Sequence, residues 1–174
     1  MTTTAVSSSF ASIIKNGAEL ALMYAEGLVK DISPETFAHM PQPNINSAAF
    51  NLGHLSIYPD VRILGFLGRE DLVKPLPYSA DLFKAGAPCV GTPGAYPAKD
   101  VIVSTFFARY RAAIEALDGV SDEHFLKPNP VEGRMRELFP TIGGVVNFLF
   151  VGHTQSHLGQ ISVWRRVMGL GSVF

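Results

Sequence analysis

The chain has 174 residues, enough for one domain with a substantial core, and we expect a single domain over residues 1–174. Charged residues make up 17% of it and the net charge is -1, so the strongly basic surface of a nucleic-acid-binding protein is not expected. The one cysteine, Cys89, excludes an intrachain disulfide and fits a reducing compartment. Residues 1–9 lack the features of a signal peptide, so we expect a cytoplasmic protein.

Apolar periodicity predicts two helices in the first half of the chain. Residues 10–30 carry apolar or small residues at helical spacing, and serines precede them as candidate caps. After a proline-rich connector, a second helix is expected from about residue 47 to about residue 67. Pro59 lies inside this helix and cannot donate a backbone hydrogen bond, so a kink is expected near Leu55.

The connection after the second helix is unusually long. Residues 68–99 contain five prolines and four glycines. Loops of this length are often functional, for example as a lid or a pocket wall, but a simple crossover between two parallel helices also needs length. Both interpretations stay open. Cys89 lies in this segment, as either a reactive thiol or a bystander.

Two further helices are expected over residues 100–117 and 141–169. No Asp, Glu, Lys or Arg occurs from Leu138 to Trp164, and a helix without charge is normally buried. Polar residues in the middle of this stretch argue against a membrane span. No alternating pattern indicates strands. These features predict an all-α fold, a four-helix bundle with a long crossover between the second and third helices.

The fourth helix carries two histidines, His153 and His157, four residues apart on one face. Their stripe is predicted to face the core and consists of Ile142, Val146, Leu149, His153, His157, Gln160, Trp164 and Val167. A pair of this kind usually consists of core residues bonded to a carbonyl or a hydroxyl. His54 on the second helix changes the interpretation. If the two helices pack together, three imidazoles converge into a metal site with open positions, suited to Zn, Ni, Fe or Cu.

The motif Asn51-Leu52-Gly53-His54-Leu55, followed much later by His153, three further residues and His157-Leu158-Gly159-Gln160, resembles the DinB/YfiT-like superfamily. The residues from Gln160 to Leu170 are also similar to that family, and the resemblance covers nearly the whole chain. It implies a four-helix bundle with the same crossover and a homodimer. It also implies a divalent metal, usually zinc or nickel, bound by His54, His153 and His157.

The resemblance further implies chemistry that depends on a low-molecular-weight thiol such as bacillithiol or mycothiol. We therefore expect a metal-dependent thiol S-transferase, or a related hydrolase or isomerase, acting on a small electrophilic substrate. The alternative is a non-catalytic bundle that binds metal or a small ligand in a stress response, because no acidic residue is evident near the histidines. No nucleic-acid or membrane partner is expected.

Several polar residues near the histidines have two open interpretations. Gln160 and Asn51 either orient a ligand or a ligating histidine, or form ordinary interhelical hydrogen bonds. Asp60 either accepts the free N–H of a histidine or is a solvated surface carboxylate. Arg165 suits the negative end of the fourth helix, or else contacts an anionic substrate. Tyr58 is expected to do no more than pack.

Overall fold

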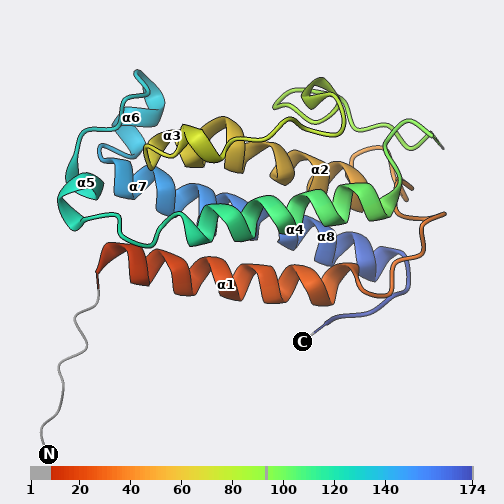
Figure 1. Ribbon diagram of the computed structural model, residues 1–174. Coiled ribbons are helices and arrows are strands. Elements are labelled where there is room, and N and C mark those ends of the chain that lie inside the picture. The colour runs from red at the N-terminus through yellow and green to blue at the C-terminus, as the bar shows by residue number, and fades with distance from the viewer. Residues whose placement is uncertain (1–8, 93, 174) are drawn as a thin grey trace, which may run out of the picture.

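The computed structural model describes residues 9–92 and 94–173, and this part of the chain is helical, with one isolated bridge between Pro128 and Thr141 and no strand. The all-α class predicted from the sequence is therefore confirmed. None of the helices in the described ranges is both long and apolar enough to cross a membrane. Long helical segments run side by side in Figure 1, and two of them are the single helices α1 (Phe10–Val29) and α4 (Lys99–Glu115). Another consists of α2 (Ala48–Tyr58), the π-helix η1 (Pro59–Ile63) and α3 (Leu64–Phe66). The last consists of α7 (Ile142–Asn147), the π-helix η4 (Phe148–His153) and α8 (Thr154–Val167).

Short hydroxyl side chains set where three of these segments begin. Ser9 accepts a hydrogen bond from the backbone N–H of Ser12 at the start of α1, and Ser47 caps α2 in the same way. Thr141 caps α7. Each cap has an extended backbone, so that its side-chain oxygen satisfies an N–H that has no partner in the first turn. Shorter helical turns lie between the long segments, namely η2 (Glu70–Leu72), η3 (Ala80–Leu82), α5 (Asp122–Leu126) and α6 (Arg134–Leu138).

Helix α2 is the most buried element of the fold. Every residue from Ala48 to Ile57 is buried, because α2 packs against both α4 and α8. Helix α1 packs against α8 and α4 on the opposite side. The large side chains between the helices include the fully buried Trp164, Tyr110 and Phe150. His54 lies in the middle of α2 and is therefore held within the protein interior.

The long connection runs along α2. In Figure 1, α2 and α4 point in the same direction, and the chain between them returns over α2. Phe83 in this connection is fully buried, and the ring of Tyr96 stacks on it with centroids 5.2 Å apart. The Tyr78 hydroxyl lies 2.6 Å from the Ser56 hydroxyl of α2. The connection is therefore attached by several side chains to the helix that carries His54.

Among the residues that the structure describes, the backbone widens into a π-helix at two places, and the first of these is at Pro59. Helix α2 is regular through Tyr58, past the predicted kink near Leu55, and the change in geometry begins only at the proline. Proline supplies no N–H for a helical hydrogen bond, so a wider turn is one way to accommodate it.

The second π-helix, η4, rotates the faces of α8. Buried positions advance there in steps of four residues, through Val146, Phe150, Thr154 and Leu158, because a π turn holds more residues than an α turn. Beyond His153 the predicted core stripe is therefore only partly right, because Trp164 is fully buried but other members of the stripe are not. Gln160 and Val167 are exposed, and the two histidines are half-buried at the edge of the core.

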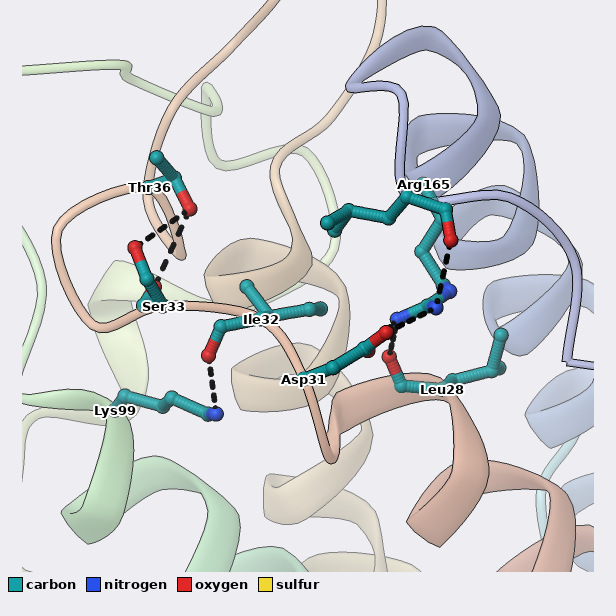
Figure 2. Close-up of polar contacts among 8 residues, drawn as sticks. Leu28, Asp31, Ile32, Ser33, Thr36, Lys99 and Arg165 are labelled. Carbon is teal, nitrogen blue, oxygen red and sulfur yellow. Dashed lines mark hydrogen bonds and ion pairs between the residues drawn. The ribbon is translucent and has the colours of Figure 1, made fainter.

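Arg165 fastens the end of α8 to the end of α1. Its side chain is buried, its Nη1 donates to the carbonyl of Leu28 at 2.8 Å, and it forms an ion pair with Asp31 (Figure 2). Beside this pair, Lys99 at the start of α4 donates to the carbonyl of Ile32. The guanidinium of Arg165 thus has protein partners, and its contact with an anionic substrate finds no support.

Candidate metal centre

Three histidines from two helical segments lie together. His54 comes from α2, His153 ends η4, and His157 lies in the first turn of α8. One nitrogen of each ring lies within 4.8 Å of the corresponding nitrogens of the other two rings. Nε2 of His54 is 3.2 Å from Nε2 of His153, and the ring centroids of His54 and His157 are 4.5 Å apart. The convergence that the sequence predicts is therefore present.

Asn51 determines the orientation of His157. Its amide nitrogen donates to the carbonyls of Asn46 and Ser47, at 3.3 and 3.1 Å. The amide oxygen is consequently the atom that faces Nδ1 of His157, at 2.9 Å. An amide oxygen can only accept, so Nδ1 carries the proton and Nε2 keeps a free lone pair. Of the roles considered for Asn51, the geometry favours positioning of a candidate ligand.

A backbone carbonyl orients His54 in the same way. The carbonyl oxygen of Phe83 lies 2.6 Å from Nδ1 of His54, so this nitrogen donates and Nε2 is left with its lone pair. Metal-ligating histidines in proteins typically donate their second N–H to such an oxygen. Sequence reasoning missed Phe83, because a backbone carbonyl leaves no side-chain pattern. The only signal was the unusual length of residues 68–99.

The polar atoms of this cluster fit a divalent cation. Nε2 of His153 faces Nε2 of His54, and Nδ1 of His153 is buried without a hydrogen-bond partner within residues 9–92 and 94–173, so no protein oxygen holds either nitrogen of this ring. Two nitrogens that bind one zinc ion at about 2.0–2.1 Å in tetrahedral geometry lie about 3.3 Å apart. The 3.2 Å between Nε2 of His54 and Nε2 of His153 is close to that separation. Three imidazoles leave coordination positions open for another ligand.

Burial keeps the three imidazoles uncharged. Desolvation lowers the pKa of His54. Desolvation, reinforced by the neighbouring histidines, lowers the pKa of His153 to about 4 and that of His157 to about 3. Neutral rings with free lone pairs are the form that binds a metal. The cluster is thus prepared for a cation near neutral pH.

Aromatic rings form one wall of the cluster. Tyr58 lies one turn after His54, and its ring centroid is 5.0 Å from that of His54 and 4.5 Å from that of His153. Phe148 lies 5.9 Å from His153 and stacks on Phe139. Burial raises the pKa of the Tyr58 phenol, so the hydroxyl stays protonated near neutral pH. These half-buried rings therefore give the cluster an apolar flank.

The other candidate residues lie in different surroundings. Asp60 forms an ion pair with Arg109 of α4, and both side chains are only 9% exposed. It is therefore neither a histidine partner nor a solvated carboxylate. The Cys89 sulfur is half-buried and accepts a hydrogen bond from the Ser47 N–H at 3.4 Å. Gln160 is exposed and lines a cavity of about 360 Å³ with Asn44, Ile45, Asn46, Ser156, Gly159 and Val163.

The family model described as DinB superfamily matches residues 18–161, a range that includes the three histidines, Asn51 and Phe83. No curated protein matches the chain. The family match therefore covers all the residues that build the candidate metal centre.

Proposed function

The chain belongs to the DinB superfamily, and we propose that it is a metal-dependent enzyme that joins a low-molecular-weight thiol to a small electrophilic substrate. The observation that carries this proposal is the cluster of three imidazoles, two of which have their Nδ1 within hydrogen-bond distance of a protein oxygen. The proposal includes the four-helix bundle with a crossover that the family resemblance implies, and zinc or nickel as the metal.

Each residue of the proposed site would have its own role, either in binding the cation or in orienting a residue that binds it. His54, His153 and His157 would bind the cation, which supplies Lewis-acid chemistry and favours the thiolate form of a thiol. The Phe83 carbonyl and Asn51 would hold two of the rings in place. In an addition to an epoxide, a carbon–sulfur bond forms, a carbon–oxygen bond breaks, and the thiol proton ends on that oxygen. The proposal also includes the related reactions, hydrolysis and isomerisation, at the same centre.

A direct test is metal analysis of tag-free protein. We expect about one divalent ion per chain, and loss of that ion in His157→Ala. The matched control is His39→Ala, because His39 is exposed and its hydrogen bonds with Thr36 and Trp164 use only its backbone atoms. If His157→Ala retains as much metal as the wild type, the site is not the one proposed. The enzymatic part of the proposal is tested separately, by screening thiols against epoxides and maleylpyruvate with the metal-loaded and the metal-free protein.

A second candidate function is non-catalytic binding of a metal or a small ligand in a stress response. The ion pair between Asp60 and Arg109 favours this non-catalytic function, because it leaves the nearby Asp60 carboxylate unavailable as a general base. Metal binding without turnover of any thiol and electrophile pair would support this alternative. Turnover that disappears on chelation would support the enzyme.

We also propose a cytoplasmic homodimer. Helix α1 exposes several large apolar side chains, namely Phe10, Ile13, Leu20 and Met23. Phe10 and Ile13 also line a cavity of about 360 Å³ with Gly143, Gly144 and Asn147 of α7. Exposed apolar surface next to a groove is typical of an interface, and a second copy of the chain is the partner that the family resemblance suggests.

A further inference from the structure

We propose that Phe83 is a positioning residue for His54, and that metal binding and the packing of residues 78–83 on α2 stabilise each other. The inference rests on the proposed metal site and adds a regulatory link to it. Its basis is that one residue of the long connection contacts two consecutive residues of α2. The carbonyl of Phe83 accepts from His54, while the ring of Phe83 lies on Gly53.

The contact between Phe83 and Gly53 requires a glycine. A Cβ atom built on Gly53 would lie 2.3 Å from Cε1 of the Phe83 ring, with two further ring atoms at 2.5 and 2.6 Å. Such distances are far inside van der Waals contact, so any other residue must displace the ring. Phe83 is fully buried and stacked on Tyr96, so little free space surrounds it. The position of the Phe83 ring, and with it the position of the Phe83 carbonyl, therefore depends on the absence of a side chain at Gly53.

A second attachment holds the same segment. The Tyr78 hydroxyl lies 2.6 Å from the Ser56 hydroxyl, and Ser56 in turn donates to the carbonyl of Gly53 at 2.6 Å. The rings of Tyr78 and Phe83 meet edge to face, with centroids 5.3 Å apart. The segment therefore reaches α2 through a hydroxyl pair and a buried ring, and both contacts lie within one turn of His54.

The Phe83 carbonyl affects metal binding through the tautomer of His54. Because the carbonyl accepts the Nδ1 proton, the lone pair of His54 lies on Nε2, which faces His153. Without that acceptor the ring is free to rotate or to move its proton. A cation that binds the correctly oriented ring must stabilise the segment by the same factor by which the segment strengthens metal binding. The connection between α2 and α4 would thereby respond to metal.

The first measurement is zinc affinity, by competition with a chromogenic chelator. Gly53→Ala should weaken zinc binding by roughly 10- to 100-fold, the usual loss when a partner of a metal-ligating histidine is removed. Gly159→Ala is the matched control, since it is also a helical glycine near a histidine and a Cβ there meets no atom within 4 Å. Equal affinities of wild type and Gly53→Ala would overturn the inference and leave the metal site standing. Absence of zinc binding by the wild type would overturn both.

A second variant keeps the inference testable if Gly53→Ala does not fold. Phe83→Ala retains the backbone carbonyl but removes the ring that anchors it, so zinc affinity should fall here too. Adding Gly53→Ala to Phe83→Ala should cost little more, because the clashing ring is gone. Amide hydrogen exchange provides the reciprocal readout. Zinc should slow exchange in residues 80–83 of the wild type, and unchanged exchange would contradict the coupling.

Discussion

The amide oxygen of Asn51 lies 2.9 Å from Nδ1 of His157 and can only accept a hydrogen bond, since the amide nitrogen donates to two carbonyls. Asn51 is fully buried on α2, whereas His157 lies in the first turn of α8, so the contact joins the two helical segments that carry the candidate metal ligands. It fixes both the rotation of the imidazole and the nitrogen that holds its proton.

Replacement of this asparagine should weaken both metal binding and the fold. Asn51→Leu has a similar volume but leaves the Nδ1–H of His157 and the carbonyl of Asn46 without their partner, whereas the carbonyl of Ser47 still accepts from the backbone N–H of residue 51. We expect zinc affinity to fall by roughly 10- to 100-fold and the free energy of unfolding to fall by about 1–3 kcal/mol. Chelator competition and urea denaturation measure these effects. Asn44→Leu, at an exposed asparagine, is the control, and an equal loss in both variants would contradict the role of Asn51.

The metal-free protein should lose stability in mild acid. The folded-state pKa values of His153 and His157, about 4 and about 3, lie below the ordinary value of 6.5, so the unfolded chain binds more protons between these limits. The contribution of these two histidines to the free energy of unfolding is therefore greatest above about pH 6.5. It decreases as the pH falls toward 4.

Urea denaturation across this pH range would measure the slope. His157→Gln removes one of the titrating groups and should flatten the slope, whereas His39→Gln should not. An identical slope in wild type and His157→Gln would show that the buried histidine is not its source. In the folded protein, protons should displace zinc only as the pH approaches the lower values of about 4 and about 3, where the ligating nitrogens of His153 and His157 begin to bind protons.

The buried ion pair of Asp60 and Arg109 should be strongly coupled. Asp60→Asn leaves the guanidinium of Arg109 buried without its countercharge, although Arg109 still donates to the carbonyls of Lys74 and Pro75. We expect the free energy of unfolding of Asp60→Asn to be lower than that of the wild type by about 3–5 kcal/mol. The double variant Asp60→Asn with Arg109→Met should lose less than the sum of the two single variants, as measured by urea denaturation. Additive losses would indicate that the two residues do not interact.

The proposed dimer makes a prediction about helix α1. Ile13→Glu places a charge on the exposed apolar surface next to the groove that Phe10 and Ile13 line with α7. Light scattering coupled to size-exclusion chromatography should show a shift from dimer to monomer. Val61→Glu, which is equally exposed but lies on η1, should remain dimeric. A wild type that is monomeric at all concentrations would refute the dimer.

Local patterns in the sequence were sufficient to predict the helices and the metal-ligand candidates. Apolar spacing marked α1 and α4, serines marked the start of α1, and the charge-free run to Trp164 marked a buried helix. His54 and the pair of His153 and His157 stood out because polar residues are rare in such surroundings. These signals are local, since helix formation and burial depend mainly on residues one or two turns apart.

Only the tertiary structure decided which atoms complete the site. The π-helix η4 rotates α8, so Gln160 is exposed and the histidines lie at the edge of the core, a change that ideal helical spacing does not predict. The Phe83 carbonyl reaches His54 from a distant segment, and Asp60 is taken up by Arg109. Contacts of this kind depend on how distant segments pack, and a backbone carbonyl carries no residue-specific signature. The sequence by itself therefore determined the candidate ligands, and the packing of the long connection and α4 around α2 determined their partners.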